Sequence, residues 1–295
     1  MREFCKFHPV VNLIYFVFVI GFSCLFLHPL CVGLSLACGF VYSVMLKGRK
    51  AIKTNLLYIL PVLILTMLIN PAFNHEGVTV LMYLPSGNPL TAESVACGAC
   101  SALMLVGVIL HFSCFNEVMT SDKIIYIFGK ILPSVSLIIS MTLRFVPKFS
   151  KQLKAVSNAQ RCMGRGGTDG KLIDRIKHGL DIISIMITWA LENAADTADS
   201  MKSRGYGIEG RSAYSIYTFD NRDKKALFVI LALGVFTLFG YFSGEMSISF
   251  FPYIKTSEVS LYGLSVFLSF ALLCMYPIIV EICEVIKWKA LRSKI

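Results

Sequence analysis

Long runs of apolar residues without a charged side chain are the feature that most limits how this chain can fold. Residues 10–27 contain no charge, and a second uncharged run, residues 30–46, follows directly after His28 and Pro29. A membrane-spanning helix needs about 20 predominantly apolar residues. Only 16% of the chain is charged, against about 25% in an average soluble domain. The chain is therefore predicted to be an all-α integral membrane protein.

Charge in the connecting segments predicts the orientation of these helices. About six spans are expected, at residues 10–27, 30–46, 54–70, 95–115, 226–242 and 259–280. Of the 28 Lys and Arg residues, 14 lie between Lys148 and Lys225, and four more lie between residues 47 and 53. Because cytoplasmic segments are enriched in Lys and Arg, both regions are predicted to be cytosolic. Six crossings then place both termini in the cytosol as well.

One further apolar segment, residues 124–147, does not fit a simple count of crossings. A crossing there would place the basic central region outside the cell. The segment is therefore predicted to be a helix that is broken near Pro133 and dips into the inner leaflet or packs on the spans. The predicted organisation has four parts: N-terminal spans at 1–123, this amphipathic or membrane-dipping helix at 124–147, cytosolic helices at 148–225, and two C-terminal spans with a basic tail at 226–295.

Two amphipathic helices are predicted within residues 148–207, and each ends at an Arg-Gly pair, Arg165-Gly166 or Arg204-Gly205. In the second helix, mostly apolar residues recur in steps of three and four, which places them on one helix face. These residues are Leu180, Ile183, Ile187, Ala190, Ala194, Thr197 and Met201. A weaker row in the first helix contains Phe149, Leu153, Val156 and Met163. Glycine readily adopts the left-handed conformation that ends helices. The same pattern is also typical of helices that lie on an anionic membrane surface.

Several other functional classes lack their required residues. The net charge of +10 is not accompanied by a basic face with interleaved aromatic residues, so no nucleic-acid partner is expected. Cys97 and Cys100 have the spacing of a metal or redox pair but lack the further ligands or the βαβ setting. The glycines of residues 205–210 match a dinucleotide fingerprint without the preceding strand, and residues 164–171 lack the first glycine and the final Ser or Thr of a phosphate loop. No catalytic, cofactor or metal site is predicted.

The segment Ala198-Asp-Ser-Met-Lys-Ser-Arg-Gly-Tyr-Gly207, followed by Arg211-Ser212 and by Asp220 and Asp223, resembles the signature of a known family. That family is the T component of energy-coupling factor (ECF) transporters, the EcfT/CbiQ family. Residues 70–94 and 132–147 resemble two further patterns of the same family. The resemblance covers residues 70–225, which is over half of the chain.

The resemblance implies a non-catalytic scaffold of an ABC importer in the bacterial cell membrane. Its implied partners are two cytosolic ATPases and a separate membrane S component that binds a vitamin or a metal ion. In that family, arginines at helix ends pair with acidic side chains in grooves of the ATPases, for which a forked and permanently charged guanidinium is suited. The implied docking residues are Met201, Arg204, Gly205 and Tyr206 at one helix end, and Arg165 and Gly166 at the other.

The first docking arginine has two candidates. The family usually carries Ala-Gln-x-Ala-Arg-Gly at this point, but here Met163 occupies the arginine position, between Arg161 and Arg165. Arg165 is preferred because it follows a glycine at the helix tip. Arg161 lies one residue, or about 100°, to the side of the apolar row that passes through position 160.

A membrane carrier that binds its own substrate, or a transmembrane enzyme, is the alternative interpretation. A carrier is expected to bring ionisable residues or broken helices together near the middle of the bilayer. The predicted spans contain almost no ionisable residues, and His111 lies near the inner end of its span. Arg144, in the segment 124–147, is interpreted as a snorkelling or packing residue. These features favour the scaffold.

Overall fold

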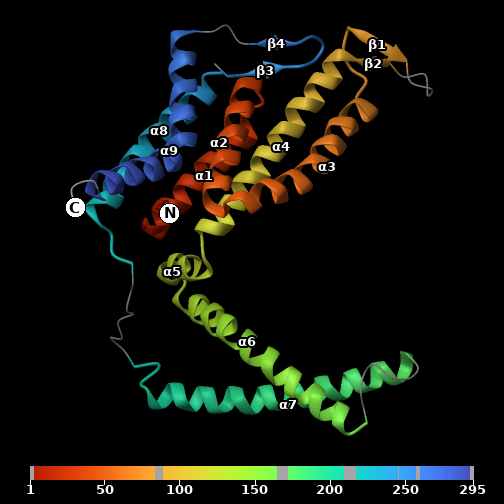
Figure 1. The fold of residues 1–295 in the computed structure, drawn as a ribbon, viewed down its shortest axis with the longest axis vertical. Coiled ribbons are helices and arrows are strands. Elements are labelled where there is room, and N and C mark those ends of the chain that lie inside the picture. The colour runs from red at the N-terminus through yellow and green to blue at the C-terminus, as the bar shows by residue number, and fades with distance from the viewer. Residues whose placement is uncertain are drawn as a thin grey trace. The chain divides into compact units, whose positions relative to one another are not determined.

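The computed structural model describes residues 3–83, 89–164, 172–208, 217–244, 246–256 and 260–292. The chain forms two units, whose elements are labelled in Figure 1. Unit 1 contains Met1–Ile124 and Tyr217–Ile295, and unit 2 contains Ile125–Ile216. The predicted boundary at residue 123 lies next to the division between the units. The boundaries predicted after residues 147 and 225 lie inside helices.

Unit 1 is built from apolar helices, two of which begin at a proline. Its helices are α1 (Pro9–Leu25), α2 (Pro29–Lys47), α3 (Arg49–Phe73), α4 (Ala92–Val118), α8 (Asn221–Phe242) and α9 (Leu261–Arg292). Proline is favoured at the first helical position because its fixed φ suits the helix and its missing N–H would be unsatisfied there. Five of these helices are long and apolar enough to cross a membrane, and α1 is equally apolar but 17 residues long. The predicted all-α membrane fold is confirmed.

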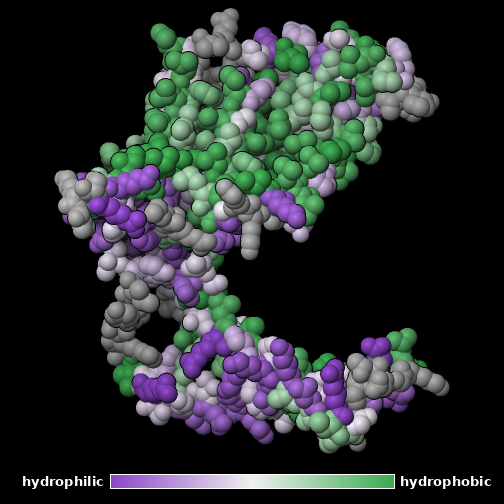
Figure 2. Space-filling view, in the orientation of Figure 1, coloured by the Kyte–Doolittle hydropathy of each residue, from purple (hydrophilic) through white to green (hydrophobic). Residues whose placement is uncertain are grey.

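The side chains on the outside of unit 1 are those expected of a surface in lipid. Figure 2 shows apolar residues over most of the visible face of unit 1, with hydrophilic residues concentrated toward its lower end. In α3, leucines at four positions, Leu56, Leu57, Leu65 and Leu68, are each more than half exposed. Such a surface is costly in water but not in hydrocarbon, where lipid tails cover it.

An aromatic core fills the interior of unit 1. Its largest fully buried side chains include Phe4, Tyr15, Phe16, Phe22, Phe26 and Phe270. At the contact between α8 and α9, small residues allow the two backbones to approach closely. A Cβ atom added at Gly240 would lie 2.4 Å from both Cγ atoms of Val266, and the hydroxyls of Thr237 and Ser269 lie 3.2 Å apart. The α8–α9 pair is therefore fixed by close packing and by a hydrogen bond.

The N-terminal segment is part of this core. The short 3₁₀ helix η1 (Phe4–Lys6) precedes α1, and the backbone N–H of His8 donates to Asp223 Oδ1 at 3.2 Å. Lys123, at the start of α5, is buried and donates to the carbonyls of Cys5 (2.5 Å) and Val118 (3.1 Å). Burial lowers the pKa of the Lys123 ammonium from its ordinary value. The first residues of the chain thus connect α8 and the end of α4.

Two short antiparallel hairpins lie outside the helices of unit 1. They are formed by β1 (Val80–Tyr83) with β2 (Pro89–Thr91) and by β3 (Ile248–Ser249) with β4 (Lys255–Thr256). Glu93, at the start of α4, accepts hydrogen bonds from the backbone N–H and the hydroxyl of Thr79. The β1–β2 hairpin lies between two of the predicted spans, residues 54–70 and 95–115. The contacts of Glu93 give the loop a defined conformation.

Unit 2 consists mainly of two long helices, α6 (Pro133–Cys162) and α7 (Leu172–Ser203). α5 (Ser121–Ile131) contains the boundary between the units and ends just before α6 begins. The break predicted near Pro133 is present, because Leu132 has an extended φ of −134° and α6 starts at the proline. α6 then continues through Pro147. Neither α5 nor α6 is among the five described helices that are long and apolar enough to span a membrane.

Candidate functional site on two crossed helices

α6 and α7 pack against each other along one stripe of each helix, and Figure 1 shows them crossing. Side chains that are half-buried or buried recur in steps of three and four on both helices. On α6 they are Leu137, Met141, Phe145, Phe149, Gln152, Val156 and Gln160. On α7 they are Ile182, Met186, Trp189, Asn193, Thr197 and Met201. Side chains with this spacing lie on one helix face, which in each helix is turned toward the other.

The packed stripes differ in part from the rows predicted from the sequence. Met201 and Thr197 lie in the predicted row and in the observed stripe. Ile183 and Ile187, however, are 53% and 56% exposed, and Met163 is also mostly exposed. The periodicity identified two amphipathic helices correctly but did not give the face that each helix turns to its neighbour, because several adjacent positions on each helix are apolar.

Aromatic side chains hold the crossing point. The rings of Phe149 and Trp189 meet edge to face, with their centroids 5.3 Å apart. The Lys148 ammonium lies 5.5 Å from the centroid of the Trp189 ring and donates a hydrogen bond to Asn193 Oδ1. An edge-to-face aromatic pair contributes about 0.5–1.5 kcal/mol beyond the burial of its area. These contacts tie the middle of α6 to the middle of α7.

The remaining faces of α7 are open. None of the described residues of α7 is fully buried, and Leu180, Ile183, Ile187 and Leu191 are each more than half exposed. Part of this surface forms an open hollow of about 400 Å³ between the helices, lined by Phe149, Leu153, Ile183 and Ile187 among others. Exposed apolar patches of this kind mark surfaces that another protein or a membrane covers.

α7 ends in a Schellman motif centred on Gly205. The N–H of Tyr206 donates to the carbonyl of Met201 at 3.0 Å, and the N–H of Gly205 donates to the carbonyl of Lys202 at 2.9 Å. Gly205 has a φ of +79°, a conformation that side chains with a Cβ rarely adopt. The predicted glycine stop is therefore confirmed. It leaves Arg204 exposed at the tip of the helix.

Arg204 lines a groove between the C-terminal end of α7 and the N-terminal half of α6. The groove has a volume of about 380 Å³, and its charged residues are Arg144, Lys148, Asp196 and Arg204. The backbone N–H of Arg204 donates to the carbonyl of Met201 at 3.2 Å, but within the part of the chain that the structure describes its guanidinium forms no hydrogen bond or ion pair. Three cations face one carboxylate, so the groove can accept an acidic side chain from another molecule.

Arg144, Lys148 and Asp196 are members of this groove that are not among the docking residues predicted from the sequence. The sequence predicts a snorkelling or packing role for Arg144, whereas in the structure this residue lines the groove together with Met201 and Arg204. A signal was available, because Arg144 and Lys148 are four residues apart and so share one helix face. Their proximity to Arg204, which lies 60 residues after Arg144 and 56 after Lys148, depends on how α7 crosses α6.

α6 also ends at a glycine. Gly164 has a φ of +75°, and its N–H donates to the carbonyl of Arg161 at 3.0 Å. Arg161 lies exposed in the last turn of the helix. Arg165 and Gly166, the second predicted docking pair, lie outside the described residues. α6 itself ends at Cys162, and the turn that follows it reaches Gly164, the residue before Arg165.

Buried polar residues in unit 1 are relevant to the alternative interpretation, in which the chain is a membrane carrier that binds its own substrate. Ser23 Oγ lies 2.7 Å from Ser35 Oγ, which lies 3.1 Å from His111 Nε2. A Cβ atom at Gly39 would lie 3.3 Å from the same nitrogen, so the His111 side chain is packed closely against α2. Hydrogen bonds of this type between membrane helices stabilise their association. Among the residues that the structure describes, no group of three or more His, Cys, Asp or Glu is placed to hold a metal ion.

Comparison with known proteins gives one consistent family. Residues 6–214 match the family model CbiQ, described as "Cobalt transport protein". The chain is 35% identical over 119 residues to the energy-coupling factor transporter transmembrane protein EcfT of Lactobacillus helveticus, covering 40% of this chain and 43% of that protein. It is 31% identical over 102 residues to EcfT of Streptococcus thermophilus, covering 34% of this chain and 39% of that protein. The alignments thus span about two fifths of the length of these relatives.

Proposed function

The chain belongs to the CbiQ family of cobalt transport proteins, and we propose that it acts as the T component of an energy-coupling factor importer. In this role it couples two cytosolic ATPases to a separate membrane S component that binds a vitamin or a metal ion. It hydrolyses no ATP itself and carries no cofactor. We place it in a bacterial cell membrane with both termini in the cytosol, as the distribution of basic residues favours.

The observation that carries this proposal is the end of α7. The Schellman motif places Arg204 at an exposed helix tip next to Gly205, where a partner backbone can approach closely. We assign Met201, Arg204, Gly205 and Tyr206 to the docking of one ATPase. The Arg204 guanidinium pairs there with a carboxylate of the ATPase, and the excess of positive charge in the surrounding groove supports this pairing.

A second ATPase requires a second docking end, which we assign to Arg165 and Gly166. The structure supports this assignment in one respect, because α6 ends at Cys162 and the turn that follows it places Gly164, with its positive φ, directly before Arg165. Arg161 remains inside the last turn of α6, where its side chain lies beside the helix instead of beyond its end.

The crossing of α6 and α7 supplies the mechanical part of the proposal. Closure of the two ATPases moves the helix tips. Because Phe149 packs on Trp189 and Lys148 binds Asn193, the two helices transmit this movement together. The exposed apolar residues of α7 then pass the movement to the S component and the membrane.

Co-purification tests the proposal. The tagged chain is expected to retain two ATPase subunits in mild detergent, and Arg204→Ala is expected to release one of them while the chain still inserts in the membrane. Truncating one partner of a desolvated charge pair costs about 2–5 kcal/mol, largely because the other charge is left unpaired. Lys177→Ala, which removes an exposed cation near the other end of α7, is the matched control and should retain both subunits.

Two results would contradict this assignment. Unchanged ATPase retention and uptake in Arg204→Ala would remove the docking role of this residue. Substrate binding by the purified chain without any other subunit would instead favour the carrier. For the second end, Arg165→Ala is expected to release an ATPase and Arg161→Ala is not, so the reverse pattern would identify Arg161 as the docking residue.

A further inference from the structure

A cavity of about 390 Å³ lies in unit 1 between the C-terminal part of α9 and the N-terminal segment. Its wall on α9 contains Glu281, Glu284, Trp288 and Arg292, which are spaced by three or four residues and so share one helix face. These residues follow directly after the apolar run of α9. A helix leaves the hydrocarbon at such a point and enters the headgroup region, where Trp is enriched.

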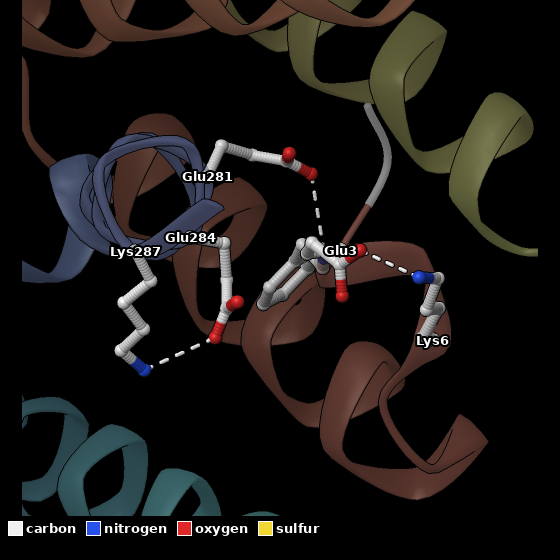
Figure 3. A network of polar contacts seen from close by, with 6 residues as sticks. Glu3, Lys6, Glu281, Glu284 and Lys287 are labelled. Atoms are coloured by element: carbon white, nitrogen blue, oxygen red, sulfur yellow. Dashed lines mark hydrogen bonds and ion pairs between the residues drawn. The ribbon is translucent and has the colours of Figure 1, made fainter. Parts of the chain in front are cut away.

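One side of the cavity is acidic. Glu281 is 2% exposed and accepts a hydrogen bond from the backbone N–H of Phe4 at 3.1 Å, as Figure 3 shows. Glu3 and Glu284 also line the cavity, and each contacts a lysine three residues away, Lys6 and Lys287. These lysine side chains are 66% and 68% exposed, so the two ion pairs are screened by solvent and weak. An ionised carboxylate has about four acceptor positions, which leaves capacity for another cation.

The other side of the cavity is basic. Lys289 and Arg292 line it five and eight residues beyond Glu284, and Trp288 lies between Glu284 and Lys289 along the helix. A simple anion bound here would face three carboxylates, and a simple cation would face two basic side chains. The arrangement of charge therefore fits a molecule that carries a cation and an anion a short distance apart.

We propose that this cavity binds the headgroup of phosphatidylethanolamine, a zwitterionic phospholipid with a primary ammonium group. The ammonium has three N–H groups, which match the three carboxylates of Glu3, Glu281 and Glu284. The phosphate accepts hydrogen bonds from Lys289 and Arg292, for which guanidinium geometry is well suited. A choline headgroup has no N–H to donate, and a glycerol headgroup brings negative charge without a cation.

The neighbouring face of α9 provides a path for the acyl chains. Ile282 and Ile286 are exposed, and they lie beside the cavity wall one helical turn apart. A lipid held in this way contacts Glu3 on the N-terminal segment and Glu281 on α9 at the same time. It therefore strengthens the attachment of η1 to α9, which already includes the Phe4–Glu281 hydrogen bond and the edge-to-face contact between the Phe4 and Tyr276 rings.

Lipid exchange with the wild-type chain tests the proposal. The full chain is placed in nanodiscs of phosphatidylcholine alone, of an equimolar mixture with phosphatidylethanolamine, and of an equimolar mixture with phosphatidylglycerol. Native mass spectrometry then measures which lipid stays bound. We expect phosphatidylethanolamine to be retained preferentially and to raise the melting temperature. Equal retention of the choline and ethanolamine lipids, or preferential retention of the glycerol lipid, would overturn the proposal.

Substitutions in the cavity test whether the lipid binds there. Glu284→Gln and Arg292→Ala are each expected to lower retention of phosphatidylethanolamine by about tenfold or more, since each removes a charged hydrogen-bonding partner. Glu192→Gln on α7 and Lys225→Ala at the start of α8 remove exposed charges elsewhere and should retain the lipid. Retention in either cavity variant equal to that in its control would show that the lipid binds elsewhere.

Soluble glycerophosphoethanolamine separates a lipid site from a site for a free metabolite. The soluble compound has the same charges but lacks acyl chains, so we expect it to compete only weakly with the lipid. If the soluble compound alone raises the melting temperature as much as the lipid does, the cavity is not a lipid site and this proposal fails.

Discussion

Replacing Gly240 with alanine tests how closely α8 and α9 must pack. The added Cβ would lie 2.4 Å from Val266 Cγ1 and Cγ2, whereas an ordinary contact is 3.4 Å or longer. The two helices must therefore separate by about 1 Å at this level. Such a movement lengthens the 3.2 Å contact between Thr237 and Ser269 to about 4 Å, which is beyond hydrogen-bonding range.

The size of the effect follows from these contacts. Overpacking of a close-packed interior costs about 1–3 kcal/mol. Loss of a hydrogen bond between membrane helices adds on average about 0.6 kcal/mol. Alanine is itself favoured over glycine within a helix by about 0.5–1 kcal/mol, which offsets part of the loss. We expect Gly240→Ala to lower the free energy of unfolding by about 1–3 kcal/mol.

Reversible unfolding of the purified chain in mixed detergent micelles, followed by circular dichroism, provides the measurement. Gly33→Ala in α2 is the matched control, because a Cβ at Gly33 meets nothing within 4 Å. This control should be neutral or slightly stabilising. Val266→Ala removes both clashing methyl groups, so Gly240→Ala should cost less in that background. If Gly240→Ala is as stable as Gly33→Ala, or if Val266→Ala gives no rescue, the packing argument is wrong.

Three other predictions concern the N-terminal segment, the crossed helices and the topology. Asp223→Ala removes the acceptor of the His8 N–H and the carboxylate that caps α8, so it should destabilise the chain by about 2–4 kcal/mol in the same unfolding assay. Asp122→Ala, which removes an exposed carboxylate from the first turn of α5, should cost far less. Equal losses of stability in the two variants would contradict the role of Asp223 in holding the N-terminal segment against α8. Trp189→Ala should speed amide hydrogen exchange in the middle of α6, because it removes the ring that packs on Phe149. Leu191→Ala, which changes a side chain that is 67% exposed, should leave this exchange unchanged. Unchanged exchange in both variants would show that the Phe149–Trp189 pair does not hold α6 and α7 together. A reporter that is active only outside the cytosol and is fused to the C-terminus should stay silent, and its activity would refute the six-span topology.

Local features of the sequence predicted the main elements. Uncharged runs of sufficient length predicted the helices of unit 1, and the all-α membrane fold is confirmed. Pro133 predicted the break between α5 and α6, and Gly205 predicted the end of α7. These predictions succeed because hydrophobic length, the missing proline N–H and the conformational freedom of glycine act within a few residues of the chain.

The contacts that define the candidate sites depend on tertiary structure. The packed stripe of α7 includes Trp189 and Asn193, which the predicted apolar row omits, because a helix with several adjacent apolar positions can turn more than one face to a neighbour. The groove that joins Arg144 to Arg204 and the cavity that joins Glu3 to Glu281 likewise bring together residues 60 and 278 positions apart. Sequence by itself determined which segments are helical and, at Pro133 and Gly205, where a helix begins or ends. Only packing decided which side chains meet, because such contacts depend on the relative placement of helices and not on the local preferences of the chain.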